Sequence, residues 1–228
     1  KIFKIKKQEQ EEFYEGVLKK AIKSTSKPVI RKVVQKMMQI MGEQFVMAED
    51  ITSAIKRAHK TKVDGYCYSY DMLGEGARTQ KMADFYFDEY MGAIDAIGKG
   101  NKKSKRLDDG ISIKLSALDS RYMLNQYELV HERLYQKLKT LVQKAKEYDL
   151  QVTIDAEEVD RLDLSLTLIE RLLLDEDLKG YNKLGLALQA YQKRAFYVID
   201  FLVDLAKRAK KSIPVRLVKG AYWDTEIK

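Results

Sequence analysis

Six polar side chains stand at or near the ends of short apolar or alternating runs: Lys114, Asp155, Glu157, Gln189, Arg216 and Lys219. If these runs are parallel strands of one sheet, their carboxyl ends meet at one edge and the six side chains converge on one mouth. Several cations with few acids suit an anionic substrate and a cofactor whose negative charge grows during the reaction. A Schiff-base enzyme competes with this interpretation, because Lys114 or Lys219 could be a nucleophilic amine. Taken singly, Lys219 or Glu157 could be a surface charge, and Asp155 could cap a helix.

The elements that must position these residues repeat from residue 65 onward. Each run is followed by a longer stretch with helical spacing, such as Asn125–Tyr148 or Tyr191–Lys210. Strand, helix and strand repeated in this way indicate parallel βαβ units with right-handed crossovers, and therefore an α/β fold. The runs expected to contain strands are Gly65–Leu73, Gly110–Leu118, Leu150–Ala156, Leu184–Ala190 and Ile213–Gly220.

Two parallel architectures compete, an open doubly wound sheet and a closed (β/α) barrel of the TIM type. Bulky aliphatic residues alternate with small or polar ones in Ile111–Ser116, Val152–Asp155 and Leu184–Gln189. A sheet covered by helices on both faces would be more uniformly apolar, and no glycine-rich dinucleotide motif follows the first run. The pattern therefore predicts a barrel. At roughly 37 residues per unit, the eight units of such a barrel need about 300 residues after position 65, whereas 163 are present. We therefore expect a barrel truncated after about five strands.

Residues 1–62 are predicted to form an N-terminal helical segment, and residues 63–228 the first part of the barrel. Pro28 is expected to separate the first two helices of that segment. Apolar residues recur at helical spacing in Phe13–Ile22, Val33–Met41 and Glu49–His59.

The composition excludes several classes of protein. Of 228 residues, 45% are hydrophobic and 33% charged, which excludes disordered and collagen-like chains, and no apolar run is long enough to span a membrane. With one cysteine, Cys67, and two histidines, we expect a reducing compartment and no metal site. The net charge of +8 permits anionic partners. However, basic runs such as Lys1–Lys7 and Lys102–Arg106 are more often solvated surface than a binding site.

Five segments, in family order, resemble proline dehydrogenases, most closely the proline dehydrogenase domain of bifunctional bacterial proline-utilisation flavoenzymes. They are Tyr68–Glu75, Gly110–Leu118, Asp155–Glu158, Gln189–Arg194 and Arg216–Trp223. The resemblance implies a distorted (β/α) barrel that binds FAD and oxidises L-proline to Δ1-pyrroline-5-carboxylate, the first step of proline catabolism. It implies a membrane quinone as electron acceptor. With it we expect a cytoplasmic protein that can bind peripherally to the inner face of the cytoplasmic membrane and can form homo-oligomers.

The resemblance also implies which residues bind the substrate. Lys114 looks like the family lysine that pairs with the proline carboxylate. Asp155 corresponds to the acid beside the substrate pocket and the flavin, while Asp71 and Tyr222 correspond to further pocket residues. Lys114, Asp155 and Arg216 are therefore the expected catalytic residues.

The cofactor contacts implied by the resemblance lie in the last two segments, apart from Asp155 in the third. Gln189 and Arg216 match groups that contact the isoalloxazine ring, beside which Asp155 also lies. A hydride leaving proline C5 for flavin N5 makes the ring electron-rich, and a fixed guanidinium can stabilise that charge without losing its proton. The residues that match the flavin-cradling loop are Lys219, Gly220, Ala221, Tyr222 and Trp223.

The sequence departs from the family pattern in three respects. Residues 1–30 do not resemble the ribbon-helix-helix DNA-binding module of some members, so no nucleic acid is predicted as a partner. Neither the aldehyde dehydrogenase half nor the arginine pair that the family's last barrel helix provides for the substrate carboxylate has a counterpart in these residues. We therefore expect little turnover from this fragment alone. The alternatives are a non-catalytic fragment that serves assembly and a basic nucleic-acid-binding or autoregulatory module.

Overall fold

A computed structural model describes residues 27–61, 66–104 and 108–226. They form two compact units that divide between Lys60 and Thr61, and each unit is described by itself. The helix predicted at Phe13–Ile22 lies outside the described residues, as do the basic run Lys1–Lys7 and part of Lys102–Arg106.

The first unit contains helices α2 (Lys27–Phe45) and α3 (Ile51–Thr61). The two helices predicted from the second and third apolar repeats are therefore confirmed. Pro28 lies in the first turn of α2, where its missing N–H removes no helical hydrogen bond. Asp50 precedes α3 and caps it, because its Oδ1 accepts a hydrogen bond of 2.9 Å from the amide of Ser53.

The second unit contains one sheet of five strands, all parallel to their neighbours. The strands follow one another in the sheet in the same order as in the chain. A doubly wound sheet reverses its strand order at a switch point, whereas a (β/α) barrel does not. The predicted barrel type is therefore confirmed, and the described strands form about half of an eight-stranded barrel. The strands are β1 (Ser69–Asp71), β2 (Gly110–Ile113), β3 (Val152–Ile154), β4 (Leu184–Gln189) and β5 (Val215–Val218).

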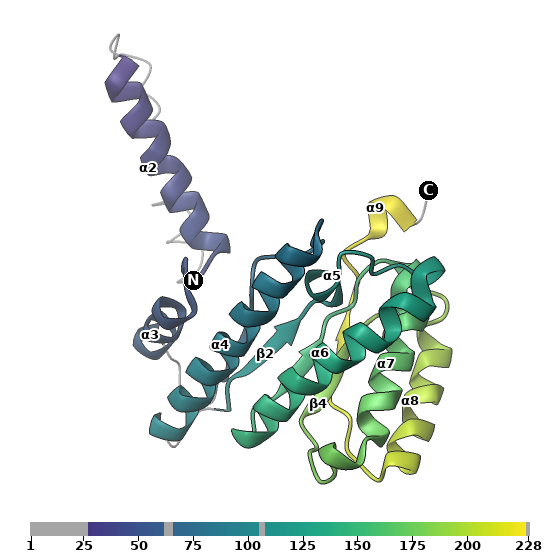
Figure 1. Cartoon of the computed structure of the whole chain (residues 1–228). Coiled ribbons are helices and arrows are strands. Elements are labelled where there is room, and N and C mark those ends of the chain that lie inside the picture. Colours follow the sequence, from purple (N-terminus) through teal and green to yellow (C-terminus); the bar gives the residue numbers. More distant parts are fainter. Residues whose placement is uncertain (1–26, 62–65, 105–107, 227–228) are drawn as a thin grey trace, which may run out of the picture. The chain divides into compact units, whose positions relative to one another are not determined.

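The long helices of this unit pack side by side in chain order over the sheet (Figure 1). They are α4 (Gln80–Ser104), α6 (Tyr127–Glu147), α7 (Leu162–Leu174) and α8 (Ala195–Ala209). Short elements stand between them: α5 (Leu115–Leu118), η1 (Leu124–Gln126), η2 (Val159–Arg161), η3 (Glu176–Leu178) and α9 (Trp223–Glu226). Of the helices in the described ranges, none is long and apolar enough to cross a bilayer.

The two faces of the sheet differ as the alternation predicts. Ile111, Ile154 and Leu186 are at most 2% exposed and belong to the apolar core. Ser112 and Thr153, at the intervening positions, contact the Arg216 side chain inside the half-barrel instead. Successive residues of a strand point to opposite faces, so this alternation separates a core face from a polar interior.

The strands end earlier than the runs suggest. The run Gly110–Leu118 is not one strand, because β2 ends at Ile113 and Leu115–Leu118 forms the single-turn helix α5. The amide of Ser116 donates to the Glu157 carboxylate, 3.1 Å away, instead of to a neighbouring strand. Lys114 remains extended between the two elements. The interior side chains therefore stand where the ladder stops.

The segment that leads into β5 passes very close to β4 at Gly185. A Cβ at this position would overlap the backbone carbonyl of Pro214, which leads into β5. We expect Gly185→Ala to lower the free energy of unfolding by about 2 to 3 kcal/mol, because backbone cannot move aside as a flexible side chain can. Urea denaturation measures this change.

Gly92 provides the matched control. It lies in α4, and a Cβ there would meet nothing within 4 Å. Gly92→Ala should stabilise the protein by about 0.5 to 1 kcal/mol through helix propensity alone. Similar unfolding curves for the two variants would contradict the close approach.

Candidate active site

Three charged residues meet where β1, β2 and β3 end. Asp71 is the last residue of β1, Lys114 follows β2 and Asp155 follows β3. The Lys114 ammonium lies 2.5 Å from Asp71 Oδ1 and 2.9 Å from Asp155 Oδ2. The side chains of Lys114 and Asp155 are 15% and 14% exposed, whereas that of Asp71 is 51% exposed. The predicted convergence of these residues is therefore present.

The environment of Lys114 keeps it charged. Burial by itself would lower the pKa of the ammonium, but hydrogen bonds to Asp71 and Asp155 and their negative charges raise it well above its ordinary value. A nucleophilic amine must be unprotonated. Lys114 is therefore suited to bind an anion and unsuited to form a Schiff base near neutral pH.

Arg216 extends from β5 across the interior of the half-barrel. Its Nη1 donates to Ser112 Oγ at 2.9 Å and lies 3.4 Å from Asp155 Oδ1, while its Nη2 donates to Ser69 Oγ at 2.7 Å. Thr153 Oγ1 is 3.5 Å from Nη2. Since β1 and β5 are the two edges of the sheet, one arginine can reach both only because the sheet is strongly curved.

The hydroxyl partners of Arg216 were not among the predicted site residues. Ser69, Ser112 and Thr153 look like ordinary strand residues in the sequence. Their signal is the alternation itself, because each occupies an interior position two residues before Asp71, Lys114 or Asp155. Three successive strands thus present a hydroxyl to the same guanidinium.

A hollow of about 290 Å³ opens beside Arg216 and Asp155. Small residues such as Ala187 leave this space open. The hollow collects six of the predicted cofactor-binding residues, while Tyr222 and Trp223 do not line it. The full lining is Asp155, Ala156, Ala187, Gln189, Arg216, Val218, Lys219, Gly220 and Ala221.

Gln189 is buried and holds its neighbours by both ends of its amide. Oε1 accepts a hydrogen bond of 2.9 Å from the amide of Ala221, and Nε2 donates to the backbone carbonyl of Glu157 at 2.9 Å. Gln189 therefore connects the segment after β5 with the segment after β3.

The segment after β5 needs glycine at position 220. Gly220 has a φ of 132°, and a Cβ there would overlap the Tyr191 ring. The same ring meets Trp223 edge-on, with centroids 5.9 Å apart. Trp223 is 57% exposed. Burial, together with nearby acids, raises the pKa of Tyr222 to about 12, so its phenol stays protonated at neutral pH.

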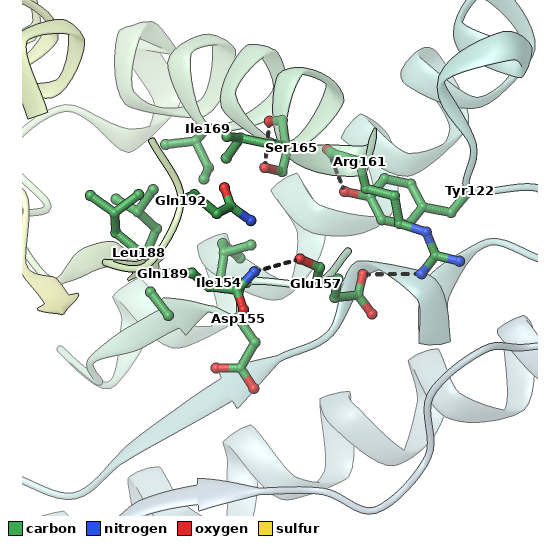
Figure 2. A pocket seen from close by; sticks show the side chains of 14 residues that line it. Tyr122, Ile154, Asp155, Glu157, Arg161, Ser165, Ile169, Leu188, Gln189 and Gln192 are labelled. Carbon is green, nitrogen blue, oxygen red and sulfur yellow. Dashed lines mark hydrogen bonds and ion pairs between the residues drawn. The ribbon is translucent and has the colours of Figure 1, made fainter. Parts of the chain in front are cut away.

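Glu157 is a buried carboxylate, so the surface-charge interpretation of this residue is wrong. Its side chain is 3% exposed, and burial raises its pKa against the opposing effect of hydrogen bonds from Ser116. Figure 2 shows Glu157 and Asp155 pointing in different directions beside a cavity of about 20 Å³, which has room for one water molecule. Glu157 therefore lies behind the mouth, while Asp155 faces it.

Comparison with known proteins decides the family. Residues 54–228 match the family model of proline dehydrogenase. The chain belongs to the proline dehydrogenase family. It is 50% identical over 212 residues to the bifunctional protein PutA of Klebsiella aerogenes, which is 92% of this chain and 16% of that protein. It is 31% identical over 184 residues to proline dehydrogenase 1 of Bacillus subtilis subsp. natto, which is 81% of this chain and 53% of that protein.

A solved proline dehydrogenase relative supports the same fold. A mutant of proline utilization A (PutA) from Bradyrhizobium japonicum matches with a TM-score of 0.74 and 48% identity, over 88% of this chain and 20% of that chain. The chain thus spans at most about a fifth of these PutA proteins and about half of the shorter dehydrogenase.

Asp155 should contribute more to stability than Asp71, because only Asp155 lies between two cations, and its side chain is less exposed. Asp155→Asn should lower the free energy of unfolding by about 1.5 to 3 kcal/mol, the usual range for a charge-assisted hydrogen bond. Asp71→Asn should lower it by less than about 1 kcal/mol, because water screens its half-exposed carboxylate. Urea denaturation at neutral pH measures both changes, and equal losses would contradict this account of the network.

Proposed function

We propose that this chain provides part of the active site of a flavin-dependent proline dehydrogenase, which oxidises L-proline to Δ1-pyrroline-5-carboxylate. The observation that carries the proposal is the convergence of Lys114, Asp155 and Arg216 beside the hollow, in a chain of the proline dehydrogenase family. The five described strands supply only about half of the strand ends of a full barrel. We therefore do not expect the described residues alone to enclose the substrate.

Lys114 is suited to bind the proline carboxylate. An ammonium has three N–H donors, and Asp71 and Asp155 take two of them. The third can bond to a substrate carboxylate. The two acids also hold the cation in position, so little side-chain entropy remains to be lost on binding. As proposed pocket residues, Asp71 and Tyr222 would flank this carboxylate.

The residues around the hollow fit a flavin. Small side chains at Ala156, Ala187 and Ala221 leave space there, and Arg216 puts a permanent cation at its edge. When bound, the flavin supplies a two-electron acceptor for the hydride that leaves proline C5. Arg216 is held by Asp155 and by the strand hydroxyls, so it can stabilise developing negative charge without reorganising. We propose that the flavin is FAD, held by Gln189 and the segment Lys219–Trp223.

Further parts of the proposal rest on the family alone. They are a membrane quinone as electron acceptor, a cytoplasmic location with peripheral membrane association, and homo-oligomer formation. A domain boundary near residue 62 is proposed from the change of sequence pattern near residue 65. Within the described residues, several basic side chains are paired with acids, such as Lys137 with Asp84 and Lys139 with Asp175. This pairing weakens the nucleic-acid-binding alternative.

Arg216→Met should slow flavin reduction more than it weakens proline binding. A charge directed at the place where negative charge develops acts chiefly on the transition state. We expect kcat to fall at least about tenfold with a smaller change in KM, measured by steady-state and stopped-flow reduction of a flavin-loaded protein with the complete barrel. Arg216→Lys keeps the charge but loses the forked pair of N–H donors, so its kcat should lie between those of the wild-type protein and Arg216→Met. A raised KM with unchanged kcat would exclude this role.

Lys114→Ala should have the opposite profile. Losing a charge-assisted bond worth about 1.5 to 3 kcal/mol should raise KM for proline roughly 10- to 100-fold. Lys183 is the matched control, because like Lys114 it is paired with two carboxylates. They are those of Asp108 and Asp149, each 2.9 Å from its ammonium, but Lys183 precedes β4 and so lies at the opposite end of the strands. Lys183→Ala should leave KM unchanged. If proline affinity survives Lys114→Ala, the carboxylate is held elsewhere.

A further inference from the structure

A continuous set of hydrogen bonds connects the carboxyl-terminal end of β4 with the segments that follow the other four strands. Ser116, in α5 after β2, holds the segment after β1. Its Oγ accepts from the amide of Gly76 at 3.0 Å, and its carbonyl accepts from the amide of Ala77 at 2.8 Å. Two of the four segments are thereby joined through one serine.

Glu157 accepts hydrogen bonds from both Ser116 and Gln189. One carboxylate oxygen accepts the Ser116 amide at 3.1 Å, and the other accepts the Ser116 hydroxyl. The backbone carbonyl of Glu157 accepts from Gln189, whose side-chain oxygen holds Ala221 after β5. Glu157 is therefore the central member, with its side chain directed to the β2 end and its backbone to the β4 end.

The Ser116–Glu157 pair is offset by two residues from the Lys114–Asp155 ion pair. Both members of the ion pair lie where β2 and β3 have just ended. The last described backbone hydrogen bond between them runs from the Asp155 amide to the Ile113 carbonyl, at 2.9 Å, and beyond it the described bonds between the two segments involve side chains. The bonds between Ser116 and Glu157 are made at that point, so they fix the spacing of the segments that carry Lys114 and Asp155.

Burying Glu157 is energetically costly, and its neighbours only partly offset the cost. The nearest cation, Arg161, has its Nη1 3.8 Å from Oε2, beyond hydrogen-bond distance. A carboxylate removed from water needs hydrogen-bond partners, and Ser116 donates both of the hydrogen bonds described for this carboxylate. An uncharged residue would fill the same volume without this cost. The presence of a carboxylate at this position is therefore explained by its hydrogen bonds to the amide and the hydroxyl of Ser116.

We infer that Glu157 is a positioning residue of the substrate site, which fixes Lys114 relative to Asp155 by holding Ser116. The expected effect of Glu157 on proline binding rests on the proposed function, whereas its expected effect on the segment that carries Ser116 does not. A residue that sets the position of Lys114 should affect proline binding more than the chemical step.

Glu157→Gln in a flavin-loaded protein with the complete barrel is the direct test. The amide oxygen of Gln can replace only one of the two carboxylate oxygens that accept from Ser116, and the NH₂ group at the other position cannot accept a hydrogen bond. By hydrogen exchange, the amides of Gly76, Ala77 and Ser116 should exchange at least about tenfold faster, while those of β2 and β3 keep their protection. KM for proline should rise at least about fivefold, with kcat changing less than about twofold.

Asp160→Asn is the matched control, since Asp160 is an exposed acid three residues along the same segment. It removes the same charge and should change neither the exchange rates nor KM. If it reproduces the effects of Glu157→Gln, the cause is net charge, and the inference is wrong.

Variants of Lys114 separate positioning from a general loss of structure. In the Lys114→Ala background, Glu157→Gln should raise KM no further, because the group that it positions is gone. The inference would be overturned if Glu157→Gln raised KM in the Lys114→Ala background as much as it does alone. It would also be overturned if the exchange rate of the Ser116 amide were unchanged in Glu157→Gln alone.

Two outcomes need a second measurement. If Glu157→Gln does not fold, Ser116→Ala, which removes only the hydroxyl, is measured in the same way. It should give the same changes at smaller size, and unchanged exchange at Gly76 and Ala77 would overturn the inference. If a wild-type protein with the complete barrel does not oxidise proline, the proposed function fails. The exchange rates of residues 114–118 then still decide whether Glu157 holds the segment that carries Lys114.

Discussion

The site depends on one carboxylate that faces two cations. Asp155 Oδ2 lies 2.9 Å from the Lys114 ammonium, and Oδ1 lies 3.4 Å from the Arg216 guanidinium. Without this carboxylate, two positive charges would share the mouth and repel each other. Lys114 follows β2 and Arg216 lies in β5, which are not neighbours in the sheet. The shared acid therefore brings together charges that backbone hydrogen bonds alone would not join.

This arrangement requires space inside the half-barrel. Arg216 reaches Ser69 on the opposite edge strand, so its side chain must pass over the interior face of the strands between them. The interior positions of β4 include Gly185 and Ala187, which fill little of that space. Small residues on one strand thus let a long cation on the next reach its partners, and they also leave the hollow open.

Much of the fold could be predicted from local patterns. The period-two alternation identified which residues face the core, because successive side chains of a strand point to opposite faces. It also located the strand ends to within a few residues. It failed at Leu115–Leu118, where an apolar stretch forms a helical turn, because the partner of the Ser116 amide is a carboxylate 41 residues further along the chain. No local propensity contains that information.

The sequence by itself determined the fold class, the family and the polar residues that follow each strand, since these depend on residue types and their spacing. Tertiary structure decided which of those residues meet. Arg216 finds its hydroxyl partners 104 and 147 residues away, at Ser112 and Ser69, and Glu157 is buried behind the mouth, not exposed at it. The physical reason is that both outcomes depend on the curvature of the sheet, which arises from the packing of all its strands and helices together.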